Sequence, residues 1–160
     1  MEIREHVISM LVNNRPGVLA RVSGVFGRLG YNIESLCVAE TISPKVSRIT
    51  SVSKGDSQFM EKVRKALNRL VDVIEVTELE DTHSVKREMM LIGLSFDEKA
   101  RAEIGQAVSM FGCSVVSMKD NYCIVQAVGN KMEVETILNY LKPIGVRDVC
   151  RSGAIALENK

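Results

Sequence analysis

The chain is poor in the residues that most catalytic and metal-binding sites use. Its 160 residues include no tryptophan, two histidines and four cysteines. No two cysteines form a C-x-x-C pair, and neither His6 nor His83 has a ligand-type residue at metal-site spacing, so the sequence favours neither a disulfide nor a metal. We expect Cys37 and Cys123 to behave as small hydrophobes in apolar strands, and each histidine to lie on a sheet surface or in a linker.

An excess of one charge and a long apolar run are also missing. Lysine and arginine number 21 against 20 aspartates and glutamates, so no basic surplus is present to attract a phosphate backbone, and we expect no nucleic-acid partner. No apolar run approaches the roughly 20 residues that span a bilayer, and residues 1–5 show no signal-peptide core. We therefore expect no membrane partner and a cytoplasmic protein. Walker-type and G-x-G-x-x-G phosphate loops are absent as well.

The most informative pattern lies in residues 13–41. Turn and cap residues fill positions 13–17, and an amphipathic helix is expected over 16–29, with Gly30 ending it. The predicted buried stripe of this helix consists of Val18, Leu19, Val22, Val25, Phe26 and Leu29. A strand follows at once, and it brings the Asn32 amide close to the start of the helix if it pairs beside the first strand.

This segment presents groups suited to a free amino acid. The loop before the helix offers unpaired backbone N–H groups and the positive end of the helix dipole, where a small carboxylate fits. Asn14 and Asn32 add amide donors and acceptors, and Gly17 has no Cβ to block a ligand. The same residues also fit a purely structural role, in which Asn14 caps the helix and Gly17 turns the chain. The pattern by itself leaves both interpretations open.

The run Asn14-Arg15-Pro16-Gly17-Val18-Leu19, and above all Gly30-Tyr31-Asn32-Ile33-Glu34-Ser35-Leu36, resembles the opening ACT domain of the small regulatory subunit of acetolactate synthase (acetohydroxyacid synthase). The resemblance continues through residues 47–50, and the chain length fits the bacterial family. It implies a homodimer formed through the ACT domain, with the effector at the dimer interface. The effector-binding residues implied by the motif match are Asn14, Gly17, Val18, Leu19, Ala20, Asn32 and Ile33.

The resemblance also implies a function and a partner. Such a subunit activates a separate catalytic large subunit and confers feedback inhibition by valine, or by leucine or isoleucine. Thiamine diphosphate, magnesium and FAD are then cofactors of the catalytic subunit, and this chain binds none of them. An ACT module that senses amino acids for a different biosynthetic enzyme is the alternative. A stand-alone enzyme using Glu34 and Glu40 as acid and base is disfavoured, because exposed strand positions explain both residues equally well.

The periodicity predicts an α+β protein of two tandem ferredoxin-like βαββαβ units. In the first, strands are expected at 4–12, 31–40, 46–53 and 71–79, and helices at 16–29 and 57–70. In the second, strands are expected at 87–96, 113–119, 122–128 and 146–157, the last interrupted near 151–153, and helices at 97–111 and 130–143. We accordingly expect an ACT domain at 1–80, a linker at 81–86 and a second ferredoxin-like domain at 87–160. The first strand is apolar on both faces, which favours a dimer or larger assembly.

Overall fold

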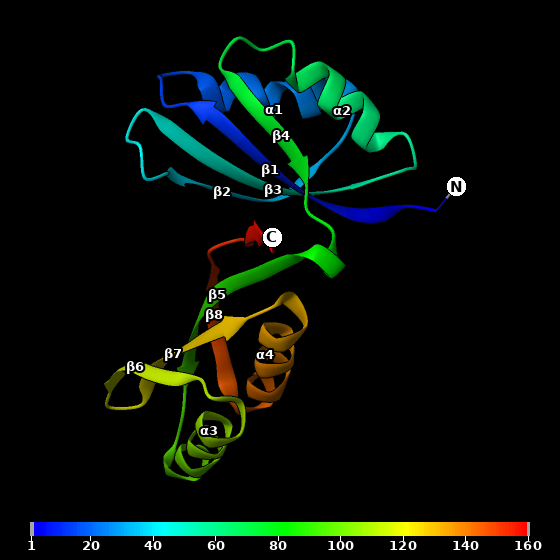
Figure 1. Cartoon of the computed structure of the whole chain (residues 1–160). Helices are drawn as coiled ribbons and strands as arrows, with labels where there is room; N and C mark the ends of the chain where they lie inside the picture. Colours follow the sequence, from blue (N-terminus) through cyan, green and yellow to red (C-terminus); the bar gives the residue numbers. More distant parts are fainter. Residues whose placement is uncertain (1, 160) are drawn as a thin grey trace. The chain divides into compact units, whose positions relative to one another are not determined.

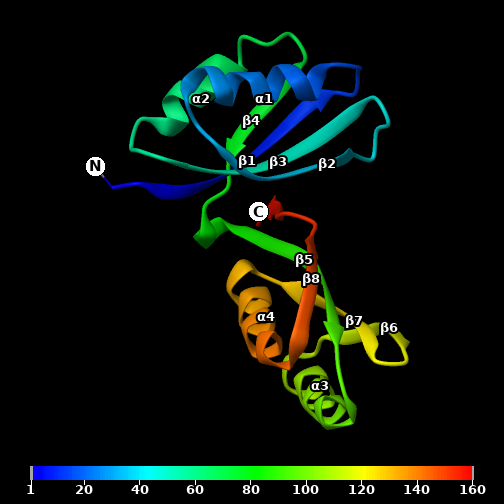
Figure 2. The same ribbon diagram turned by 180° about the vertical axis from the view of Figure 1, so that it is seen from behind.

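The computed structural model describes residues 2–159 and contains two compact units. The first unit runs through Lys86 and also includes the C-terminal segment from Ala154, and the second spans Arg87–Gly153. In each unit two helices cover one face of an antiparallel sheet, as Figure 1 and the reverse view in Figure 2 show. The predicted α+β class with two ferredoxin-like units is therefore confirmed.

The first unit has the element order expected of one βαββαβ repeat. Its elements are β1 (Arg4–Asn13), α1 (Val18–Leu29), β2 (Ile33–Glu40), β3 (Val46–Gly55), α2 (Phe59–Leu67) and β4 (Val73–Glu78). The strand order is β2-β3-β1-β4, so β2 and β4 are the edges of the sheet. Alternate residues of β1, namely Ile8, Met10 and Val12, face the helices and form the core with α1 and α2.

The opposite face of this sheet is partly covered by the C-terminal segment. Val7, Val52 and Leu79 form a small buried cluster with Ala156, which lies on β9 (Ile155–Glu158). This packing accounts for part of the apolar second face that the sequence displayed. It also means that the segment from Ala154 belongs with the first unit, whereas we had expected 87–160 to form one domain.

The second unit repeats the plan with different residues. After the short 3-10 turn η1 (Asp81–His83), it is built from β5 (Ser84–Ser95), α3 (Glu98–Phe111), β6 (Ser114–Lys119), β7 (Tyr122–Gly129), α4 (Lys131–Gly145) and β8 (Val146–Arg151). The strand order is β6-β7-β5-β8, and β9 also pairs with β5. The core lies between this sheet and its two helices, with Met90, Ile92 and Leu94 fully buried.

Local sequence signals placed most element ends close to their positions in the structure. The capping box at Asn130 is present, with Asn130 Oδ1 accepting from the Glu133 N–H at 2.9 Å and Glu133 Oε2 accepting from the Asn130 N–H at 2.7 Å. Gly30 and Gly112 end their helices in the left-handed conformation. Two helices differ in extent from the prediction: α4 continues through Pro143 to Gly145, and α2 covers only Phe59–Leu67 rather than 57–70. The expected linker is largely structured, since Ser84–Lys86 already belong to β5.

The expectation for His6 is wrong. Its side chain is buried rather than exposed, because it lies on the helix-covered face of β1. The ring stacks on Phe59 of α2, with centroids 4.5 Å apart, and Nδ1 lies 2.6 Å from a carboxylate oxygen of Glu78. Within residues 2–159 no cluster of three or more potential metal ligands occurs, and none of the helices there is long and apolar enough to cross a membrane.

Candidate functional site

The loop between β1 and α1 is held mainly by the side chain of Asn14. The Asn14 Nδ2 group donates to Glu40 Oε1 at 3.1 Å and to the Pro44 carbonyl at 2.9 Å, and its backbone N–H donates to the Lys45 carbonyl at 2.8 Å. Asn14 therefore does not cap the helix. Its Oδ1 atom, an acceptor, is the group that remains for a ligand, and an acceptor suits an ammonium rather than a carboxylate.

Gly17 is the N-cap of α1 and has a conformation that favours glycine. Its φ is +85°, and no side chain caps the helix. A Cβ atom built on Gly17 would lie 2.8 Å from the Nη1 atom of Arg21, so the guanidinium already covers this residue. The first turn of α1 contains no acidic residue. The positive end of this helix is thus left without an internal counter-charge.

Asp72, which the sequence gave no reason to single out, links several parts of this loop. Its Oδ2 atom accepts from Arg21 Nη2 at 2.7 Å, its Oδ1 atom lies 3.5 Å from Asn13 Nδ2, and Arg15 Nη1 lies 3.9 Å away. The backbone carbonyl of Asp72 accepts from the Asn13 N–H at 2.8 Å. The hydrogen bond from Arg21 is the main reason that the pKa of the Asp72 carboxyl lies below its ordinary value.

The other implied effector residues near this loop differ in exposure. Val18 is buried and belongs to the core of the first unit. Leu19 is 43% exposed, and Ala20 is also exposed, so both are available to a ligand or a second chain. Val18 therefore contributes its backbone rather than its side chain to any site at this end.

Asn32 and Ile33 lie at the opposite end of the sheet, contrary to our expectation. That expectation required β2 to pair beside β1, but β3 lies between them. Ile33 of β2 pairs with Ser53 of β3, and Ser53 also pairs with His6 near the start of β1. Asn13, at the other end of β1, pairs with Val46 of β3. The seven residue-to-residue steps from His6 to Asn13 span about 23 Å at 3.3 Å per step. One chain therefore does not bring Asn32 to Gly17.

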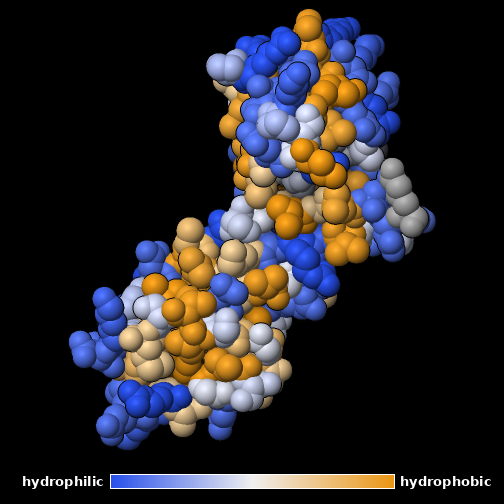
Figure 3. Space-filling model, turned by 60° about the vertical axis from the view of Figure 1, so that its left-hand side comes forward, coloured by the Kyte–Doolittle hydropathy of each residue, from blue (hydrophilic) through white to orange (hydrophobic). Residues whose placement is uncertain are grey.

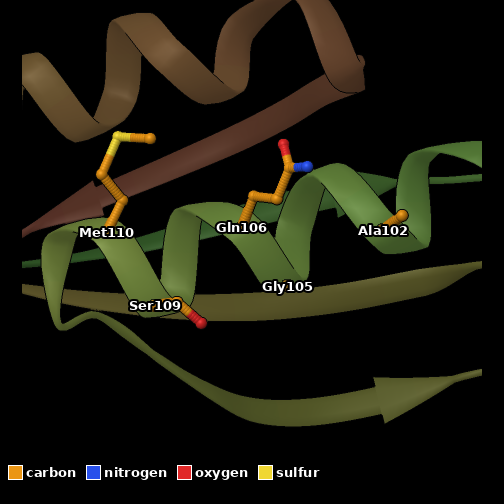
Figure 4. A pocket seen from close by; sticks show the side chains of 5 residues that line it. All are labelled: Ala102, Gly105, Gln106, Ser109 and Met110. Carbon is orange, nitrogen blue, oxygen red and sulfur yellow. The ribbon is translucent and has the colours of Figure 1, made fainter.

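Neither the surface of α3 nor the open sheet of the second unit offers a better site. A shallow hollow on α3 is lined by Ala102, Gly105, Gln106, Ser109 and Met110, all from this one helix, and none of the five is charged (Figure 4). Apolar side chains also gather on the second unit (Figure 3), where Met89, Leu91 and Val128 lie on the sheet face away from the helices. Neither surface brings together groups suited to catalysis.

Comparison with known proteins assigns both halves of the chain to one family. A model described as the AHAS small subunit-like ACT domain matches residues 8–75, and one described as the small subunit of acetolactate synthase matches residues 87–160. The acetolactate synthase small subunit of Mycobacterium bovis is 39% identical over 157 residues, covering 98% of this chain and 94% of that protein. That of Mycolicibacterium smegmatis is 38% identical, covering 95% and 89% respectively.

A solved structure agrees with these matches. The crystal structure of the acetolactate synthase small subunit from Thermotoga maritima superposes with a TM-score of 0.92 at 35% identity, covering 98% of each chain. Sequence and fold therefore agree over nearly the whole length. The chain belongs to the family of acetolactate synthase small subunits.

Proposed function

We propose that this chain is the regulatory subunit of an acetolactate synthase, and that it confers feedback inhibition by valine or another branched-chain amino acid. In this proposal it activates a separate catalytic subunit. Thiamine diphosphate, magnesium and FAD belong to that catalytic subunit, and the present chain contributes regulation alone. The membership of both halves of the chain in one small-subunit family supports this role.

The observation that carries the effector proposal is the separation of two half-sites along one sheet. Asn14 and Gly17 lie at one end of β1, while Asn32 and Ile33 are level with its other end. A free amino acid is far too small to contact both sets in one chain. A site that uses both sets therefore requires a second copy, which is the arrangement that the family resemblance implies.

The exposed edge strand β2 provides a suitable way to join two copies. Glu40, which accepts from the Asn14 side chain, ends β2, and Ile33 begins it. If two β2 strands pair antiparallel about a two-fold axis, the Ile33 end of one copy lies beside the Glu40 end of the other. This brings Asn32 of one copy near Asn14 of its partner, twice per dimer. Pairing through β4, the other edge, keeps these residues apart.

The groups that meet in such a dimer match the parts of a branched-chain amino acid. The backbone N–H groups near Gly17 face the carboxylate. The Oδ1 atoms of Asn14 and Asn32 are the acceptors available to the ammonium, since the hydrogen bond from Asn32 to Glu34, at 3.1 Å, uses only its Nδ2 donor. The half-exposed Leu19 and the half-buried Ile33 supply apolar surface for the side chain. A ligand shared between copies stabilises the dimer by mass action, by about 2.7 kcal/mol at a hundredfold excess over Kd.

Reconstitution with the catalytic subunit tests this function. The catalytic subunit from the same organism is assayed for acetolactate formation with and without this chain, across separate titrations of valine, leucine and isoleucine. We expect higher activity on addition of the chain and inhibition of that activity by at least one amino acid. Activation without inhibition would contradict the effector site alone, whereas no activation and no co-purification would contradict the regulatory role.

A further inference from the structure

We infer that Arg21, held in place by Asp72, is the residue that pairs with the carboxylate of the bound effector, an inference that rests on the proposed function. Arg21 lies outside the set that the family resemblance implied. The inference follows from the direction of its guanidinium and from the groups that fix it.

The guanidinium of Arg21 has one side fixed and one side directed at the candidate site. Its Nη2 atom donates to Asp72 Oδ2 at 2.7 Å, while its Nη1 atom lies 2.8 Å from the position that a Cβ atom would take on Gly17. Within residues 2–159, Nη1 has no hydrogen-bond acceptor. A guanidinium has five N–H donors, so the contact with Asp72 leaves donors for a second carboxylate beside Gly17.

Asp72 is suited to position this arginine before a ligand arrives. Its side chain is only 13% exposed, and it is tied to the end of β1 by Asn13 through both its carboxylate and its backbone carbonyl. The Arg21 side chain, in contrast, is 49% exposed. Without the contact to Asp72 it would be free to rotate, and it would lose that rotamer freedom when the effector binds. Pre-ordering of a charged contact in this way lowers the entropic cost of binding.

The charge balance favours an anionic ligand at this position. Arg21 and Arg15 both lie within 4 Å of Asp72, which neutralises only one of them, and the other carboxylate beside this loop, Glu40, accepts from the neutral Asn14 amide. The first turn of α1 adds no acidic residue. An α-amino acid brings one carboxylate to this place, and its bond to a guanidinium is charge-assisted and can be bidentate.

Paired ligands test this inference in the full-length chain. Binding of L-valine and of L-valinamide, which lacks the carboxylate charge, is measured by calorimetry at neutral pH for the parent, for Arg21→Gln, Arg21→Lys and Asp72→Asn, and for the double variant Arg21→Gln/Asp72→Asn. Arg28→Gln is the matched control, since it removes the same charge from the last turn of the same helix. Circular dichroism and thermal melts establish that each variant is folded.

We expect Arg21→Gln to bind valine about 10- to 100-fold more weakly than the control, in line with a hydrogen bond to a charged group. Its affinity for valinamide should stay within about twofold of the parent. Arg21→Lys keeps the charge and should recover part of the loss. As a single change, Asp72→Asn should lower the affinity for valine. In the double variant with Arg21→Gln it should cause no further loss of affinity. This result would distinguish positioning through Arg21 from a general structural role of Asp72.

Two results would be decisive in the other direction. If Arg21→Gln binds valine as tightly as Arg28→Gln, with an unchanged preference for valine over valinamide, Arg21 does not contact the carboxylate and the inference is wrong. If the parent chain, with Arg21 intact, binds none of the branched-chain amino acids, the proposed effector function is wrong, and the assignment of Arg21 to the effector carboxylate is wrong with it.

Discussion

The charge of a side chain placed at Gly17 offers the most direct test of where the effector carboxylate binds. We predict that Gly17→Asp will bind the effector far more weakly than Gly17→Asn, although the two side chains have nearly the same shape. Gly17 has a φ of +85°, which costs most L-residues about 1–2 kcal/mol. Asparagine and aspartate tolerate this conformation best, so both variants share a small backbone cost, share the shift of Arg21 Nη1 that a Cβ 2.8 Å away requires, and differ in charge.

The magnitude follows from the distance between two like charges. A carboxylate on residue 17 would lie about 4 Å from the bound carboxylate, where repulsion is roughly 1 kcal/mol in water and about 4 kcal/mol at an effective dielectric constant of 20. The corresponding loss of affinity is between about fivefold and a thousandfold. The aspartate would also pair with the nearby Arg21 Nη1 atom and withdraw it from the ligand.

The assay is a titration of the reconstituted enzyme with valine, together with calorimetry on the isolated chain. Both variants should activate the catalytic subunit as the parent does, and Gly17→Asn should remain sensitive to valine within about tenfold. Gly17→Asp should resist inhibition and bind at least fivefold more weakly than Gly17→Asn. Equal affinities for the two variants would refute the placement of the carboxylate beside Gly17, because charge is the main difference between them.

Three further predictions concern stability. Ala156→Asp should lower the free energy of unfolding, measured by urea titration, by about 2 kcal/mol or more, because it places an unpaired charge against a buried apolar cluster. Leu157→Asp, at the neighbouring 61% exposed position, is the control and should change the free energy of unfolding by less than about 0.5 kcal/mol. Gly55→Ala should lower the free energy of unfolding by about 1–3 kcal/mol, since the new Cβ overlaps the phenyl ring of Phe59 at the start of α2. Gly105→Ala, with open space around it in α3, should raise the free energy of unfolding by up to about 1 kcal/mol. Equal melting temperatures for the two variants would contradict this packing. The pKa of Asp72 is lowered in the folded state, chiefly by its hydrogen bond from Arg21, so its stabilisation exists above the ordinary pKa of 3.8 and is lost as pH falls through the folded value. The unfolding free energies of the parent and Asp72→Asn should therefore differ near neutral pH and converge in acid; a gap that persists in acid would show that the ionised carboxylate is not responsible.

Local chemistry in the sequence determined the elements and much of their capping. Residues at helical or alternating spacing predicted both βαββαβ units, and Asn130 with Glu133 predicted a capping box that is present. These features depend on contacts within about four residues, which a linear sequence displays directly. The motif around Gly17 and Asn32 also indicated the family from the sequence alone, and the comparisons confirmed it.

Tertiary structure decided which residues meet across the fold. The sequence suggested that Asn32 lies near Gly17, but β1 and β2 are both antiparallel to β3 and therefore run in the same direction, so Asn32 precedes the start of β2 near the start of β1, whereas Gly17 follows the end of β1. Asp72 joined Asn13 and Arg21, 59 and 51 residues away, and nothing in its local sequence signals that contact. The covering of Val7 by Ala156 and the burial of His6 were equally invisible. All of these features have the same physical reason. Strand pairing and burial depend on contacts between distant segments, whereas the periodicity of the sequence shows only the face of an element on which a residue lies.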